Sequence, residues 1–280
     1  MIKNQIKTLV FLGVLTALLL WVGQYFGGMT GLTVAFIFVS VLNFGMYWFS
    51  DKIVLAMYRA RQVWKNSKLY TIVKETAYDA GLPMPKVYII PSKNPNAFAT
   101  GRNPKNASIA CTQGILDLLS EKELKAVIAH ELGHIKNRDT LITTIAATIA
   151  GVIAYLAAMA RWAAIFGGFG GRDRDNNLFE LLALAILTPL IATIIQLAIS
   201  RQREYMADEQ SAKITRNPRA LANALLKIEQ GVKAHPMNIG NTATSSLFIA
   251  NPFKGSSLLN LFSTHPPIKL RVEKLNKMKI

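Results

Sequence analysis

Two histidines, His130 and His134, stand four residues apart with Glu131 between them. Positions four apart lie on the same face of a helix, so the two imidazoles can bind one metal ion. Imidazole nitrogens suit zinc, and a catalytic zinc site takes three protein ligands and keeps a fourth position for water. Glu131 is close enough to act on that water, as in the H-E-x-x-H motif of zinc proteases. The spacing therefore predicts a hydrolytic metal site that needs one more ligand.

A charged helix face with two unrelated histidines is the alternative. Val127 and Leu132 make the segment apolar, and an unpaired histidine or glutamate would be costly there. We therefore expect one tightly packed helix over about residues 121–139. Ser120 and Glu123 form a capping box at its start, with the serine before the helix and the glutamate three positions later.

A small sheet is predicted before the metal-site helix. Residues 86–90 form a short β-branched strand, and residues 96–101 and 107–112 form a strand pair joined through an Asn-Pro turn. An amphipathic helix is predicted at residues 67–80. The polar part of the chain is therefore expected to be α+β.

Four uncharged runs, residues 8–26, 31–49, 141–160 and 181–199, are each long enough to cross a bilayer as a helix. The chain is 51% hydrophobic and only 17% charged, which fits an integral membrane protein. A signal peptide is the alternative for the first run, but a second run follows it directly, which favours a retained hairpin. For the second pair, the alternative is a buried helical hairpin of a soluble core. We predict four transmembrane helices and a mainly α fold.

The net charge of +16 does not indicate nucleic acid, because the basic residues form no patch interleaved with aromatic residues. Lys and Arg gather on the cytosolic side of membrane proteins, so residues 51–139 and both termini are placed in the cytosol. The single cysteine, Cys111, excludes an internal disulfide and fits a reducing compartment. The predicted parts are a hairpin at 1–50, half of the catalytic domain at 51–140, a second hairpin at 141–200, and the other half at 201–280.

Two crossings separate His134 from the polar segment after residue 199, so both segments return to the same membrane face. Glu204 and Asp208 lie there, four residues apart and on one helical face. We interpret Glu204 as the third ligand and Asp208 as the acceptor of a hydrogen bond from a ligand imidazole. Two solvated carboxylates are the alternative. Asp139 is a rival carboxylate, but a continuous helix would point it away from the histidines.

With these motifs, the chain resembles the HtpX membrane zinc metalloproteases, relatives of the CAAX prenyl proteases, over nearly its whole length. The resemblance implies one zinc ion per chain, held by His130, His134 and Glu204, with Glu131 as general base. It maps a distal histidine and arginine onto His265 and Arg271, which could donate to an oxyanion. It also implies a multi-pass protein of the cell's inner membrane, with a cytosolic zincin-type domain engaged in quality control of membrane proteins.

The expected reaction is hydrolysis of peptide bonds in damaged or misfolded membrane proteins or unfolded polypeptides. We expect the substrate to add a strand along an exposed sheet edge, formed by Asn96, Ala97, Phe98, Ala99 and Thr100. A buried strand is the alternative for this segment. Two other functions remain open: a CAAX-type processing peptidase, and a non-enzymatic membrane scaffold stabilised by zinc.

Overall fold

A computed structural model describes residues 2–149, 201–240, 242–253 and 266–278. The predicted second hairpin, apart from its first residues, and His265 lie outside the described residues. Within them the fold is mainly helical with one small mixed sheet, as expected.

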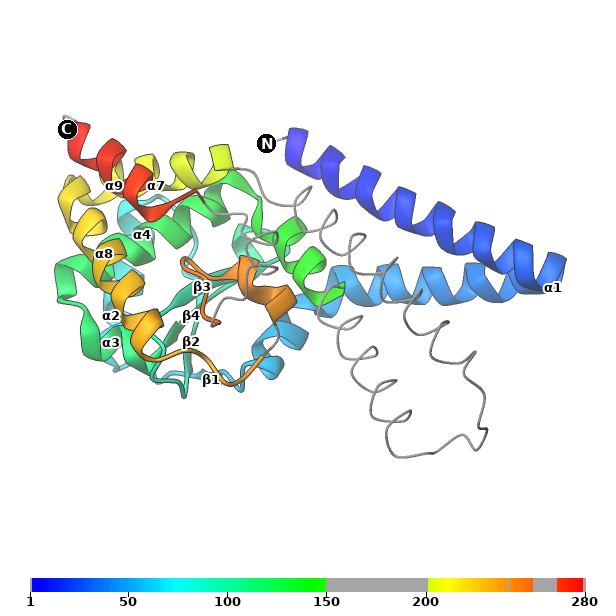
Figure 1. The fold of residues 1–280 in the computed structure, drawn as a ribbon, viewed down its shortest axis with the longest axis horizontal. Helices are drawn as coiled ribbons and strands as arrows, with labels where there is room; N and C mark the ends of the chain where they lie inside the picture. Colours follow the sequence, from blue (N-terminus) through cyan, green and yellow to red (C-terminus); the bar gives the residue numbers. More distant parts are fainter. Residues whose placement is uncertain (1, 150–200, 241, 254–265, 279–280) are drawn as a thin grey trace.

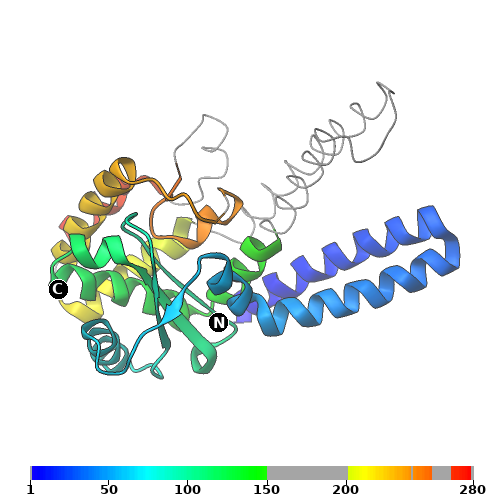
Figure 2. The ribbon, with the colours of Figure 1, turned by 90° about the horizontal axis from the view of Figure 1, so that it is seen from below.

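Helix α1, Ile2–Met57, is two helices joined at Gly28, whose backbone (φ 56°, ψ −142°) is not helical. The chain folds back there into the antiparallel hairpin seen in Figures 1 and 2. Asn43 Nδ2 donates to Thr16 Oγ1 across the two arms at 2.9 Å. The turn falls inside the predicted segment 27–30, but the second arm continues to Met57. Gly27–Met57 is long and apolar enough to cross a membrane, judged by length and composition alone.

Four strands form a sheet of order β1-β2-β4-β3, comprising β1 (Arg61–Gln62), β2 (Lys86–Ile90), β3 (Ala97–Gly101) and β4 (Ala107–Thr112). β2 and β4 are parallel, whereas the β3–β4 and β1–β2 pairs are antiparallel. The three predicted strands are confirmed within one residue, while β1 and the short helix α3 (Gln113–Leu118) were not predicted. β3 is thus an edge strand of the sheet.

The helix Thr140–Ile149 lies next to the domain end of α1, whereas five other helices gather on one side of the sheet, away from α1 (Figure 1). They are α2 (Lys68–Asp79), α4 (Glu121–Asn137), α7 (Arg201–Thr215), α8 (Pro218–Ala234) and α9 (Ile268–Lys277). Their apolar faces and the inner face of the sheet share one core, which includes Ile109, Ile128 and Leu225. Burial of these side chains from water stabilises the domain. The predicted capping box is present, with Glu123 accepting from the backbone N–H of Ser120.

Helices α4 and α7 cross closely at Gly133. A Cβ built on this glycine would lie 3.1 Å from Ala207 Cα and 3.3 Å from Gln210 Cβ. A larger residue would therefore have to push the two helices apart. The crossing lies one residue from His134 and three residues from Glu204, so it sets the distance between the two ends of the predicted metal site.

Gly133→Leu is expected to separate α4 from α7, because overpacking a tight contact costs about 1–3 kcal/mol. Thermal unfolding of the detergent-solubilised variant should begin several degrees lower, and its bound metal, measured by elemental analysis, should fall. Gly45→Leu is the control, since nothing lies within 4 Å of a Cβ there. Normal metal content in Gly133→Leu would show that the crossing does not set the site.

Candidate metal centre

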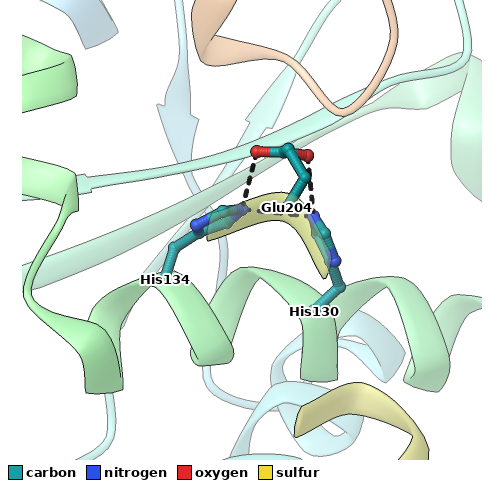
Figure 3. Close-up of side chains that lie close together, drawn as sticks. All are labelled: His130, His134 and Glu204. Carbon is teal, nitrogen blue, oxygen red and sulfur yellow. Dashed lines mark hydrogen bonds and ion pairs between the residues drawn. The ribbon is translucent and has the colours of Figure 1, made fainter. Parts of the chain in front are cut away.

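The three predicted ligands meet in space. His130 and His134 project from α4 toward Glu204 of α7 (Figure 3). The two Nε2 atoms are 3.2 Å apart. Glu204 Oε2 lies 3.7 Å from His130 Nε2, and Glu204 Oε1 lies 3.5 Å from His134 Nε2. His130 and Glu204 are buried, and the side chain of His134 retains 17% exposure.

These distances fit a metal ion better than direct contacts between the side chains. Zn–N bonds of 2.0–2.1 Å in a tetrahedral site place neighbouring ligand atoms about 3.3 Å apart. The imidazole pair matches that edge, and the carboxylate distances lie slightly above it. The donor set of two imidazoles and one carboxylate is also that of catalytic zinc sites.

Asp208 fixes the first imidazole from behind. Its Oδ1 lies 3.0 Å from His130 Nδ1, so the ring keeps Nε2 for a metal. Arg271 donates to both oxygens of Asp208, from Nε at 2.9 Å and from Nη2 at 2.6 Å. Burial alone would raise the pKa of Asp208, but Arg271 and His130 lower it to about 2. The carboxylate is therefore held ionised.

Asp139 holds the second imidazole, contrary to the prediction that it points away. Asp139 Oδ2 lies 3.3 Å from His134 Nδ1 and the side chain is buried. The reason is local: α4 ends at Asn137, and Arg138 adopts a left-handed conformation (φ 55°). This residue turns the chain so that Asp139 folds back beside the histidine.

Their surroundings shift the pKa values of the two imidazoles in opposite directions. Burial lowers the pKa of His130, and the Arg271 guanidinium lowers it further, despite Asp208. Burial would also lower the pKa of His134, but the neighbouring carboxylates, Asp139 first, raise it to about 10. A metal ligand must be a neutral imidazole, so a metal ion bound here would compete with the proton that these carboxylates favour on His134.

The charges around the cluster also suit a divalent cation. Glu131, Asp139, Glu204 and Asp208 are buried there, and so are two guanidinium groups, Arg203 and Arg271. Four carboxylates and two cations leave a formal charge of −2 when the histidines are neutral. Uncompensated buried charge is costly, and one divalent ion would cancel it.

A pocket opens on the cluster. Glu131 and the two histidines line one side, with Arg203 of α7 beside them. The lining also includes Ser246, Leu247, Phe248 and Ile249, from the 3₁₀ helix η2 (Thr242–Leu247) and the residues after it. Arg271, which was predicted to donate to an oxyanion, does not line this pocket. It is fully buried, with Nη1 at 3.5 Å from Glu204 Oε2 and its other donors on Asp208.

Of the five residues predicted to bind substrate, only Ala99 lines the pocket. Asn96 bonds through its side chain to Ala250 O, and Thr100 Oγ1 bonds to Thr144 Oγ1. Asn96 O accepts from Thr112 N on β4, so the backbone groups of Asn96 point toward β4. In an antiparallel pair this direction alternates along the strand, so the backbone groups of Ala99 point away from β4.

The outward edge of β3 is occupied at both ends. Ala97 O accepts from Ile249 N at 3.2 Å, and Gly101 O accepts from Thr140 Oγ1 at 2.9 Å. Ala99 lies between these two contacts and faces the pocket. The strand is therefore an edge of the sheet, but its residues are buried and the chain itself covers much of that edge, which fits the buried-strand alternative and not the predicted exposed edge.

Comparison with known proteins identifies the family. Residues 63–279, most of the chain, match the family model described as Peptidase family M48. The chain belongs to peptidase family M48. Two similar relatives are each described as a "Protease HtpX homolog". The one from Syntrophotalea carbinolica is 53% identical over 99% of both chains. The one from Thermococcus kodakarensis is 53% identical over 98% of this chain and 95% of the relative.

The M48 chain also shares a fold with a solved structure, the crystal structure of Ste24p from S. mikatae. That structure aligns with a TM-score of 0.52 at 18% identity, covering 98% of this chain and 66% of Ste24p. The family and the His–His–Glu cluster together identify this chain as a membrane metalloprotease.

Sequence reasoning missed several residues of the M48 site. Asp139 was set aside because a straight helix was assumed. Arg203 was not among the predicted site residues, because nothing in its spacing indicates that its side chain reaches the pocket. Residues 246–249 carry no motif, and only the folded chain brings them to β3. His265 lies outside the described residues, so its predicted role stays a prediction.

Asp139→Asn is expected to weaken metal binding about 10–100-fold, because loss of a carboxylate behind a ligand histidine has that typical effect. The affinity is measured by competition with a chromophoric chelator. Thr144→Val is the control, since Thr144 is buried nearby and bonds to Thr100, away from the ligands. An unchanged affinity in Asp139→Asn would exclude this role.

Proposed function

We propose that this M48 protease is a zinc-dependent endopeptidase in which His130, His134 and Glu204 hold the metal. The observation that carries the proposal is that the three ligand atoms lie within 4.8 Å of one another and open into a pocket that Glu131 also lines. One zinc ion per chain would satisfy this donor set and its charge. A structural zinc site is closed by four protein ligands, whereas three side chains form the described cluster.

Glu131 acts as the general base and then as the acid. When bound, zinc supplies a Lewis acid that polarises the peptide carbonyl and makes water easier to deprotonate. Glu131 takes the proton from the attacking water and returns it to the leaving amine. Its place beside both histidines on the pocket wall suits this transfer. The developing oxyanion needs a donor, and His265 is our candidate from the family resemblance.

Arg271 is better suited to positioning than to contact with the substrate. It is buried, pairs with Asp208 and lies beside Glu204. It can therefore orient Glu204, a proposed metal ligand, and Asp208, which holds the ligand His130. Among the described residues that line the pocket, Arg203 is the one with a guanidinium group. We therefore assign Arg271 to positioning these side chains, whereas Arg203 lies on the pocket side of the metal cluster.

The substrates we propose are damaged or misfolded membrane proteins, cut on the cytosolic side. Ala99 on the edge of β3 would pair with the backbone of the bound peptide. The four-helix arrangement, with hairpins at 1–50 and 141–200 and the two halves of the catalytic domain at 51–140 and 201–280, remains part of the proposal. It is supported by the α1 hairpin and by the apolar helix Thr140–Ile149 that follows the metal site.

Glu131→Gln should keep the metal but reduce proteolysis about 10²–10⁴-fold, because the amide cannot accept the proton from water. The assay follows cleavage of a denatured membrane protein by purified enzyme, with elemental analysis on the same sample. A chelator should abolish wild-type cleavage, and added zinc should restore it. Wild-type rates in Glu131→Gln, or cleavage that survives chelation, would contradict the mechanism.

Glu204→Ala should lose both metal and activity, because two imidazoles alone are a weak site. Glu209→Ala is the matched control: it lies on the same helix, is exposed and pairs with Lys213 at the surface. Metal per chain is measured after gel filtration in both variants. If Glu204→Ala retained a full equivalent of zinc, another residue would have to be the third ligand.

A further inference from the structure

The turn between β3 and β4 lies beside two apolar helices, α1 and Thr140–Ile149. The guanidinium group of Arg102, the first residue after β3, sits over the ring of Trp48 in α1, 4.0 Å from its centroid. Trp48 belongs to an exposed aromatic group that also includes Tyr47 and Phe49. Tryptophan and tyrosine at the end of an apolar helix mark the bilayer interface. The turn therefore lies at the level of the interface.

A second contact shows that β3 runs alongside α1 rather than touching it at one point. Tyr58, directly after α1, packs against Phe98 with ring centroids 5.9 Å apart. The helical rise from Trp48 to Tyr58 is about 15 Å. The strand rise from Phe98 to Arg102 is about 13 Å. Because the two rises agree, β3 leads along α1 from the catalytic pocket to the interface.

The other apolar helix meets the same end of β3. Thr140 Oγ1 donates to Gly101 O, and Thr144 bonds to Thr100. Both residues lie in the apolar helix Thr140–Ile149. This helix lies next to the domain end of α1 in Figures 1 and 2. The Gly101 end of β3 is thus held between two apolar helices.

The turn itself is hydrogen-bonded and basic. Asn103 accepts from Asn106 N at 3.0 Å and caps the 3₁₀ helix η1 (Pro104–Asn106). This arrangement leaves Lys105 exposed. Lys52 of α1 is exposed as well and lies over the Phe49 ring at 5.2 Å. Arg102 keeps several N–H donors beyond its contact with Trp48. Basic groups at an interface attract anionic headgroups.

We propose that the β3–β4 turn is a second membrane contact, in which Arg102 and Lys105, with Lys52, bind anionic lipid headgroups. The contact holds the pocket at a fixed height, since Ala99 lies three strand residues, about 10 Å, from Arg102. On the proposed function, the site then receives polypeptide that has just left the bilayer. The ligand class is a bilayer with anionic phospholipid; free phosphate would not satisfy the aromatic group beside it.

The direct test places a nitroxide label at Asn106→Cys, an exposed position next to Lys105, in the full chain, reconstituted in vesicles of phosphatidylcholine with or without phosphatidylglycerol. Cys111 is fully buried and should not react. Lys233→Cys on α8 is the exposed control. At position 106 the label should be shielded from a water-soluble relaxation reagent, more so with phosphatidylglycerol, while position 233 stays accessible. Equal accessibility at both positions in both vesicles would overturn the proposal.

The functional test compares Lys105→Gln with Lys213→Gln, which removes the same charge from the exposed face of α7. In vesicles containing phosphatidylglycerol, cleavage of a membrane-anchored substrate should fall about fivefold for Lys105→Gln. Cleavage of a soluble peptide should not change, and Lys213→Gln should match the wild type. An equal loss on both substrates would overturn the proposal. If the wild type cleaved neither substrate, the proposed function would fail, while the label experiment would still decide the membrane contact.

Discussion

The structure depends on the close crossing of α4 and α7. The crossing brings a carboxylate to two imidazoles that are separated from it in sequence by two long apolar runs. Gly133 permits the close approach because it has no side chain, and Ala207 opposite it has only a methyl group. The fold thus brings Glu204 to the histidines through helix packing rather than through a loop. Sites built on packed helices hold their ligands more precisely than sites on loops.

Each imidazole is then fixed by a carboxylate from a different element. Asp208 comes from α7 and is held by Arg271 of α9, while Asp139 comes from the segment that leads into the next apolar helix. Such a buried group of charges would be unfavourable if any member lost its partner. The site therefore links the parts of the chain before residue 150 and after residue 200, since its ligands, their partners and the arginine behind them come from both.

Regular elements were predictable because their signals are local. The hydrophobic period, the capping box of Ser120 and Glu123, and the short β-branched runs identified α4, β2 and the β3–β4 pair. The pairing of Glu204 with the histidines was inferred from membrane topology, and the structure brings these residues together. The environment of Asp139 could not be predicted in this way, because a single left-handed residue, Arg138, decides where its side chain goes.

Tertiary contacts with no sequence pattern decide the rest of the site. Residues 246–249 lack periodicity, yet Ile249 bonds to Ala97 and its neighbours form the pocket wall. Likewise, Arg271 was predicted as an oxyanion donor from its position in the family pattern. The structure buries it behind the ligands, because Asp208 is available to pair with it there. Sequence spacing gives the identity of such a residue but not the side of the metal on which it lies.

The partly covered edge of β3 constrains how a peptide could be recognised on the proposed function. Main-chain pairing along a whole strand would accept almost any sequence, since backbone groups are common to all residues. Here Ile249 and Thr140 already occupy the outward backbone groups on either side of Ala99. A bound peptide can therefore pair with the strand only over a short stretch. Discrimination between peptide sequences must therefore come from the apolar part of the lining, formed by Leu247, Phe248 and Ile249. It also depends on which polypeptide segments can reach a pocket that lies beside the apolar helices α1 and Thr140–Ile149.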